Sequence, residues 1–162
     1  TLHYVDNQGS VEPGDYIVVD VGTQVEHYAA DISRTICQGK PTARQRQVYE
    51  AVERTQQRAL ALLKPGVVYR DYERKVTGYI GEELAGLRLI TDKKDIAAIR
   101  RYYPHASSHF LGLDVHDTGD YAMNLAPGMV LTCEPGIYIP EEGIGVRIED
   151  DVLITAHGNR VL

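Results

Sequence analysis

The sequence predicts an α+β fold in which strands come first, two helices follow, and further strands complete the chain. Three observations carry this prediction. A β-branched run follows a turn near residue 15, apolar residues recur at helical spacing between residues 42 and 86, and strand-like runs occupy much of residues 129–155. At 162 residues, the chain has the length of one domain.

Residues 1–37 read as strands and turns. The tetrapeptide at 12–15, Glu-Pro-Gly-Asp, predicts a turn, and Tyr16–Val21 predicts a buried strand. A second strand is expected after Gly22, from about Glu26 to Cys37. The sequence of Thr1–Tyr4 resembles the middle of a strand, and no initiator Met precedes it. We therefore expect the chain to be a segment of a longer protein.

Two long helices are expected, at about residues 42–64 and 69–86. Thr42 and Gln45 fit a capping box at the first helix, and Pro65-Gly66 is a stop signal. The apolar faces are formed by Val48, Val52, Ala59 and Leu63 in the first helix, and by Tyr72, Val76, Tyr79, Ile80 and Leu84 in the second. The charged stretch at 91–101 is either a short helix or a surface excursion.

From Tyr102 onward the β texture returns, with strands expected at Met129–Cys133 and Gly145–Thr155. The buried, apolar setting expected for Cys133 predicts a small packing residue rather than a redox group.

Composition excludes several classes of function. Seventeen basic and 23 acidic residues give a net charge of −6, which provides no electrostatic footprint for nucleic acid or an anionic membrane surface. No apolar run approaches the roughly 20 residues that span a bilayer, and no signal peptide opens the chain. Two cysteines are too few for a disulfide framework, so a reducing cytoplasm is the expected location.

Three acidic residues lie where burial is expected: Asp20 and Glu134 each end an apolar run, and Glu149 lies inside another. A buried carboxylate is costly unless it is paired or bound to a cation. Any one of these acids is most simply explained as solvent-facing or paired with Arg, but the set, together with Asp31, indicates a shared site. Asp31 follows Asp20 by 11 residues, and a two-residue loop at 25–26 would place the two carboxylates directly opposite.

Histidines extend this acidic set. Four of the six fall where they can join the acids, namely His3, His105, His109 and His116, whereas His27 and His157 are assigned to loops or the surface. Oxygen-rich ligation with an imidazole suits Mn and Fe(II), and also Co and Zn. The charges of Asp20, Asp31, Glu134 and Glu149 balance two divalent ions. A water bridging ions about 3.5–4 Å apart can deprotonate near neutral pH and attack a carbonyl.

Five blocks of sequence, in order, carry a resemblance to a known family. They are Val19-Asp-Val-Gly22, Asp31-Ile-Ser-Arg-Thr35, Ser108-His-Phe-Leu-Gly-Leu-Asp-Val-His-Asp117, Thr132-Cys-Glu-Pro-Gly136 and Val146-Arg-Ile-Glu-Asp-Asp151. The sequence thereby resembles the pita-bread metallopeptidases (peptidase M24), which include methionine aminopeptidase, Xaa-Pro aminopeptidase and prolidase. The resemblance runs from His3 to about Asn159.

The resemblance implies a curved antiparallel sheet backed by helices, with metal ions on its concave face. It implies that Asp20 chelates one ion, that Asp31 and Glu149 bridge both, and that His109 and Glu134 complete the other. The catalytic residues that it implies are His3, His105, His116, Glu134 and Arg147. Residues 1–162 would form part of a catalytic domain whose first portion, like a separate N-terminal domain, is absent.

In function, the chain resembles the proline-specific branch, and within it the Xaa-Pro aminopeptidases. The implied cofactors are two divalent ions, first Mn²⁺ and otherwise Co²⁺, Zn²⁺ or Fe²⁺. The implied partners are peptides with an Xaa-Pro N-terminus, and the full-length protein would be a cytoplasmic homo-oligomer.

Three alternatives stay open: an Xaa-Pro dipeptidase (prolidase), a metal-free creatinase-like or peptide-binding homologue, and a segment that is inactive by itself. A distance of more than about 10 Å between Asp20 and Glu149 would exclude a two-metal site.

Overall fold

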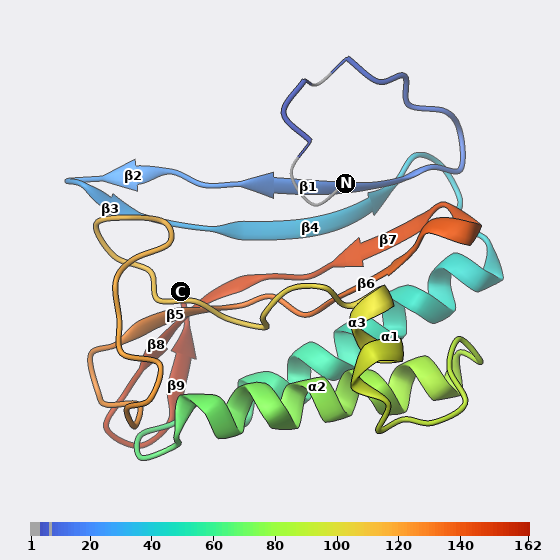
Figure 1. The fold of residues 1–162 in the computed structure, drawn as a ribbon. Helices are drawn as coiled ribbons and strands as arrows, with labels where there is room; N and C mark the ends of the chain where they lie inside the picture. Colours follow the sequence, from blue (N-terminus) through green and yellow to red (C-terminus); the bar gives the residue numbers. More distant parts are fainter. Residues whose placement is uncertain (1–3, 7) are drawn as a thin grey trace.

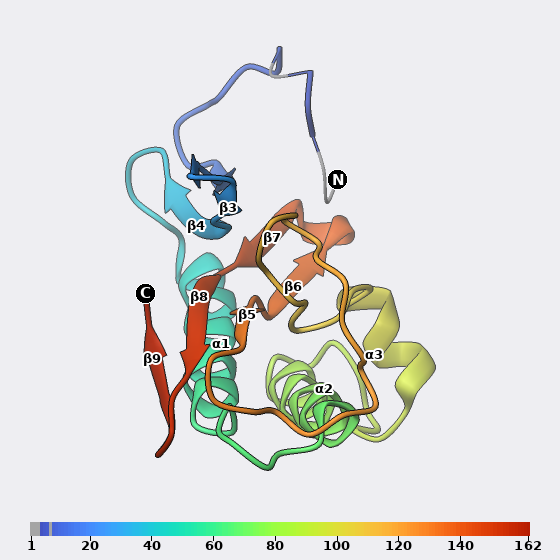
Figure 2. The same ribbon diagram turned by 90° about the vertical axis from the view of Figure 1, so that its left-hand side faces the viewer.

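Two long β-hairpins and two long helices make up most of the computed structural model, which describes residues 4–6 and 8–162. In Figure 1 the first hairpin lies at the top, the second crosses the middle, and both helices lie below them. Figure 2 shows the same layers from the side. The helices thus cover one side of the strands, as expected for the predicted α+β class.

The first hairpin consists of β1 (Tyr16–Val21), β2 (Gln24–Val25), β3 (Tyr28–Ala29) and β4 (Ile32–Cys37). β1 pairs antiparallel with β4 and β2 with β3, in the same register, so the four strands form one hairpin with a short interruption. Gly22 lies at this interruption, where a Cβ atom would come within 2.2 Å of the Ala30 carbonyl oxygen. The predicted strand at 26–37 is therefore present, but in two pieces.

The turn of this hairpin is Glu26-His27, not Val25-Glu26 as predicted. Both residues have positive φ, 49° and 74°, which is the type I′ geometry that matches the twist of paired strands. As a result Asp20 is opposite Ser33 rather than Asp31. The pairing differs from the prediction by two residues, and because side chains alternate with period two, Asp20 and Asp31 still share one face.

The second hairpin consists of β5 (Val130–Cys133), β6 (Gly136–Ile139), β7 (Ile144–Arg147) and β8 (Asp150–Ile154). A 3-10 turn, η1 (Pro140–Glu142), joins β6 to β7, and β9 (Asn159–Val161) adds to the edge of β8. β5–β8 and β6–β7 share one register, so Glu134 and Glu149 lie opposite each other in the gap between the two ladders. The single strand predicted at 145–155 was wrong in this respect, and β6 and β9 were not predicted.

The two hairpins meet along β4 and the break between β7 and β8. The Thr35 hydroxyl donates to the Arg147 carbonyl (3.0 Å) and accepts from the Arg147 N–H (3.1 Å). The Glu149 N–H donates to the Ser33 carbonyl at 3.1 Å. These bonds hold β4 of the first hairpin beside the interruption of the second.

Helix α1 (Ala43–Leu60) begins as predicted and ends earlier. The capping box of Thr42 and Gln45 is present. Beyond Leu60, the N–H groups of Leu62 and Leu63 donate to carbonyls three residues back, so the chain tightens before Pro65, which has no N–H to continue a helix. The predicted end at residue 64 is therefore four residues too late, although Leu63 is buried as expected.

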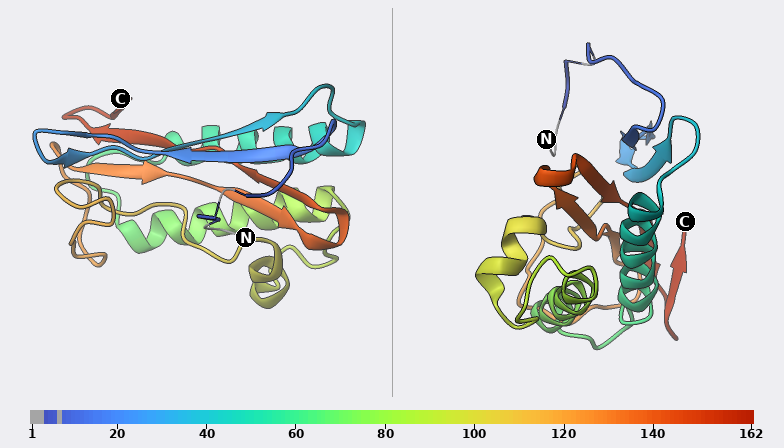
Figure 3. Two further views of the ribbon diagram at one scale, coloured as in Figure 1. Left: turned by 90° about the horizontal axis from the view of Figure 1, so that it is seen from above. Right: turned by 90° about the vertical axis from the view of Figure 1, so that its right-hand side faces the viewer.

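Helix α2 (Tyr69–Gly86) has the predicted bounds. The charged stretch that follows contains α3 (Ile96–Tyr102), capped by the Asp95 side chain, so the first of its two interpretations is confirmed. Figure 3, seen from above, shows α1 and α2 running along the strands. No helix among the described residues is long and apolar enough to cross a membrane.

The core lies between the helices and the second hairpin. Buried residues of α1 and α2 pack with Ile137, Ile139 and Val146 in one cluster and with Leu131 and Val152 in another. The segment 103–129 was expected to resume the β pattern, but apart from isolated bridges it is irregular. It passes over the place where the two hairpins meet and carries three histidines.

Candidate metal centre

The interruptions of the two hairpins and the irregular loop enclose one polar cavity of about 120 Å³. Its lining residues are Asp20, Asp31, His105, His109, His116, Glu134, Arg147 and Glu149. These are the candidate residues of the sequence analysis, apart from His3, which lies outside the described residues. The fold thus brings together side chains that are up to 129 positions apart in the sequence.

Two groups of possible ligands share one member. Donor atoms of Asp20, Asp31 and Glu149 lie within 4.8 Å of one another, and so do donor atoms of His109, Glu134 and Glu149. The separation of Asp20 and Glu149 is therefore well inside the 10 Å limit set by the sequence analysis. Two groups meeting at one carboxylate form an arrangement that can hold a pair of cations.

His109 is oriented to offer one ring nitrogen to the cavity. Its Nδ1 lies 3.1 Å from the Phe110 carbonyl, and because a carbonyl only accepts, the proton is on Nδ1. Nε2 lies 3.5 Å from Asp31 Oδ2 and 3.6 Å from Glu134 Oε1. This is the tautomer in which Nε2 can bind a metal.

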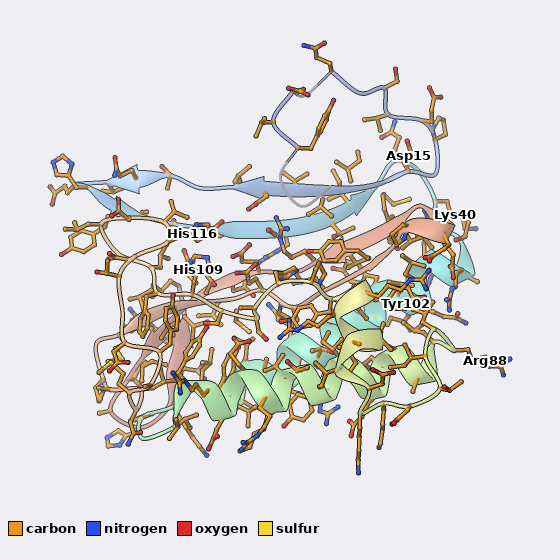
Figure 4. All side chains as sticks on the ribbon, in the orientation of Figure 1. Asp15, Lys40, Arg88, Tyr102, His109 and His116 are labelled. Carbon is orange, nitrogen blue, oxygen red and sulfur yellow. The ribbon has the colours of Figure 1, made fainter. Side chains whose placement is uncertain are left out.

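His116 comes from the same loop and lies beside His109, with ring centroids 4.4 Å apart and planes at 83°. Figure 4 shows the two labelled side chains between β4 and the strands below it. One donor atom of His116 lies within 4.8 Å of donors from Asp31 and His109, which forms a third possible group. His116 is exposed, so it lies at the mouth of the cavity.

Arg147 is the buried cation of the site. Its Nη2 donates to Asp20 Oδ2 at 2.6 Å, and its Nε donates to Ser33 Oγ at 2.8 Å. Nη1 reaches the Tyr138 hydroxyl at 3.4 Å. That hydroxyl also lies 2.9 Å from Nε2 of His105. Arg147 therefore fixes one carboxylate directly and connects to His105 through a tyrosine.

Ser33 and Tyr138 were missed by the sequence analysis. Ser33 is fully buried, with Oγ 2.6 Å from Glu149 Oε2 and 3.1 Å from Asp20 Oδ1. The signal for Ser33 was its position two residues after Asp31, which places both on one face of a strand. Tyr138 had no signal, because β6 itself was not predicted.

The carboxyl groups differ in their affinity for protons. Burial, and then the charge of Glu149, raise the pKa of Glu134 to about 8. Burial raises the pKa of Glu149 to about 7, although the Ser33 hydroxyl opposes this. Burial also acts to raise the pKa of Asp31, but its interactions with His109 and Asp20 outweigh burial and lower the value. Near neutral pH, a cation would therefore compete with protons for the two glutamates, which lie directly opposite each other.

The donor set fits divalent cations. Oε1 of Glu149 is buried and has no hydrogen-bond partner among the described residues, although its other oxygen is bonded to Ser33. A buried carboxylate oxygen without a partner is costly, and a cation would satisfy it. Carboxylates with one imidazole suit Mn, Fe(II), Co or Zn rather than a cysteine-rich structural zinc site.

Comparison with known proteins finds one family. The family model of metallopeptidase family M24 matches residues 1–156. Xaa-Pro aminopeptidase 3 of Rattus norvegicus is 41% identical over 176 residues, covering 100% of this chain and 35% of the relative. Xaa-Pro aminopeptidase of Haemophilus influenzae is 40% identical over 178 residues, covering 99% of this chain and 41% of the relative. The chain thus spans about two fifths of the length of such relatives.

Solved structures give the same result. The aminopeptidase PepP of Pseudomonas aeruginosa superposes with a TM-score of 0.93 at 37% identity, covering 99% of this chain and 40% of that one. A variant of Escherichia coli aminopeptidase P in complex with substrate has a TM-score of 0.88 at 37% identity, with the same coverage.

Proposed function

The chain belongs to metallopeptidase family M24, and from this premise we propose that its cavity is part of the active site of a metal-dependent exopeptidase. The pita-bread fold implied by the sequence is confirmed by the similarity to aminopeptidase P structures. The proposal treats residues 1–162 as one portion of a catalytic domain.

One observation carries the proposal: two groups of possible ligands that share Glu149 line a single cavity. Asp20, Asp31 and Glu149 would hold one ion, and His109, Glu134 and Glu149 would hold the other, with Asp31 and Glu149 shared by both. Mn²⁺ is the proposed ion, since oxygen-rich ligation with one imidazole suits it. When bound, such ions supply Lewis acidity, which lowers the pKa of a water and polarises a carbonyl.

The side chains of the chain supply the remaining chemistry. Glu134, whose carboxyl group lines the cavity, would accept a proton as the carboxylate and pass it to the leaving nitrogen. His116, at the mouth of the cavity, is placed to contact the scissile carbonyl or the residue after it. Arg147 orients Asp20 by a short ion pair. His105, which contacts Tyr138, and His3 are proposed to hold the substrate.

For the substrate, we propose peptides with proline at the second position. The relatives named above are Xaa-Pro aminopeptidases, and the chain matches them over nearly its whole length. A bond preceding proline is a tertiary amide with no N–H to donate, so a peptidase for it needs contacts other than that hydrogen bond. Nucleic acid and membranes are not proposed as partners.

The test is cleavage of an Xaa-Pro-Xaa tripeptide and of an Xaa-Pro dipeptide by the full-length protein, with Mn²⁺ and with chelator. We expect release of the N-terminal residue from the tripeptide, and its loss in chelator. Cleavage confined to the dipeptide would instead support the prolidase alternative. Cleavage that persists in excess chelator would contradict a metal-dependent mechanism.

A matched pair of variants separates chemistry from folding. Glu134→Gln replaces a proposed ligand and proton carrier, whereas Glu82→Gln makes the same change on the exposed part of α2. We expect the first variant to lose cleavage and the second to keep it. Equal activity of both variants would overturn the role of Glu134. It would also favour the metal-free alternative, against which the complete ligand set now argues.

For location we propose the cytoplasm, and for assembly a homo-oligomer. A reducing cytoplasm is consistent with Cys37 and Cys133 being unpaired. A homo-oligomer of the full-length protein can be checked by light scattering.

A further inference from the structure

The loop that carries His105 and His109 is held by a carboxylate on helix α2, that of Glu73. The Ser107 N–H lies 3.1 Å from Glu73 Oε1 and 3.0 Å from Oε2, so both oxygens face it. The Ser107 hydroxyl donates to Oε2 at 3.2 Å, and the Tyr69 hydroxyl lies 3.3 Å from Oε1. Among the described residues, Glu73 forms no ion pair. Most of its hydrogen bonds come from Ser107 of the loop.

Ser107 is itself buried and connects this carboxylate to the cavity. Its carbonyl accepts the N–H of Glu134 at 2.8 Å. Its hydroxyl also accepts from the Tyr103 hydroxyl at 2.6 Å, so its side chain has a fixed orientation. A single residue is therefore bonded on one side to Glu73 and on the other to the backbone of a proposed ligand.

Two residues after Ser107, the loop forms hydrogen bonds with β5 itself. The His109 N–H donates to Thr132 Oγ1 at 3.1 Å, and the Thr132 N–H donates to the His109 carbonyl at 3.0 Å. Residues 107–109 thus lie against the end of β5 like a short strand. This alignment brings His109 Nε2 to within 3.6 Å of Glu134 Oε1.

Building on the proposed function, we infer that Glu73 is a positioning residue for one metal ion, the ion assigned to His109 and Glu134. It acts through Ser107, because fixing that peptide aligns the two ligands. The other group of ligands, Asp20, Asp31 and Glu149, contains no residue of this loop. Loss of the Glu73 carboxylate should therefore weaken one ion selectively, which a general loss of stability would not do.

The test uses Mn²⁺ as the probe, titrated calorimetrically into chelator-stripped full-length protein. Glu73→Gln has nearly the same shape, but an amide group replaces one accepting oxygen, whereas Glu73→Ala removes both oxygens. Glu83→Gln is the matched control on the same helix, where the carboxylate pairs with Arg54 at 2.7 Å. We expect the wild type and the control to bind two ions. In Glu73→Gln, one ion should bind about 10- to 100-fold more weakly, a typical effect of losing a group that orients a ligand.

The other ion should bind Glu73→Gln within about twofold of the wild type, a difference of about 0.4 kcal/mol at 298 K. Unchanged binding of both ions would overturn the inference, and so would equal weakening of both. If Glu73→Ala does not fold, the near-isosteric Gln variant decides.

If the wild type itself binds no Mn²⁺, the proposed function fails, and amide hydrogen exchange in the metal-free proteins decides the inference. Exchange at Ser107, His109 and Glu134 must then accelerate in Glu73→Gln but not in Glu83→Gln, and unchanged exchange would overturn it.

Discussion

Replacing Glu134 with Gln should stabilise the metal-free protein at neutral pH while weakening its response to metal. Glu134 lies opposite Glu149 in the gap of the second hairpin, and its pKa is about 8 in the folded chain against a usual value of 4.5. The folded chain thus binds this proton more tightly than the unfolded chain. By linkage, stability falls as the pH rises from about 4.5 to about 8.

The size of the effect follows from the same shift. One pKa unit corresponds to about 1.4 kcal/mol, so the three units between 4.5 and pH 7.5 correspond to about 4 kcal/mol. At pH 5 the same argument gives less than about 1 kcal/mol. Gln carries no such penalty, because its amide does not ionise. We expect Glu134→Gln to gain about 2–4 kcal/mol at pH 7.5 and less than about 1 kcal/mol at pH 5.

The assay is thermal unfolding in chelator at both pH values, repeated with Mn²⁺. The melting temperature of Glu134→Gln should exceed that of the wild type by at least about 4 °C at pH 7.5, since about 1 kcal/mol corresponds to 2–4 °C in a domain of this size. Glu82, exposed and with its pKa lowered by a hydrogen bond from Arg58, is the control, and Glu82→Gln should not be stabilised. Added Mn²⁺ should raise the melting temperatures of the wild type and of Glu82→Gln more than that of Glu134→Gln, which keeps only one of the two proposed ligand groups complete. A lower melting temperature for Glu134→Gln at pH 7.5 in chelator, or the same gain at both pH values, would refute the reasoning.

Three further predictions follow from the same site. Arg147→Lys keeps the charge, but one ammonium cannot replace two guanidinium nitrogens that reach Ser33 and Asp20, so we expect kcat/KM to fall about 10- to 100-fold in peptide hydrolysis assays. Metal affinity should rise between pH 6 and 8, with proton release detectable by calorimetry in two buffers, because ions displace protons from the glutamates; a flat profile would contradict this. Gly22→Ala should destabilise the protein by about 1–3 kcal/mol in denaturant titrations, because its Cβ would meet the Ala30 carbonyl; unchanged stability would show that this approach is not tight.

The face on which the acids lie could be predicted from the sequence although the turn was misplaced. Moving the turn by one residue shifts the pairing of Asp20 by two positions, from Asp31 to Ser33. Because side chains alternate between the two faces of a strand, a shift of two positions leaves each side chain on the same face. The ordered motifs then indicated which acids and histidines belong together, and the cavity contains all of them that lie among the described residues. The metal-binding roles assigned to them stay predictions.

What could not be predicted depends on bonds to side chains. Pro135 lies in the gap between the two ladders, and Gly136 is already the first residue of β6, where it pairs with Arg147. The loop at 103–129 forms little regular structure, and several of its backbone N–H groups donate to carboxylates instead. Examples are Ser107 to Glu73 and Leu113 to Asp117. Such partners are distant or irregularly spaced in the sequence and leave no repeating pattern.

β1–β4 and β2–β3 keep one register across the gap in the first hairpin. This register determines where residues can be inserted into the hairpin or deleted from it without moving Asp20. The position of Asp20 is set by the pairing of β1 with β4, and the exposed turn Glu26-His27 closes the hairpin beyond β2 and β3. Extra residues inserted between Glu26 and His27 would lengthen an exposed tip and leave the acids in place. Deleting Val19 would instead turn this carboxylate to the opposite face of the strand. The tip is therefore the point at which a reporter or an affinity tag can be inserted near the cavity without disturbing it.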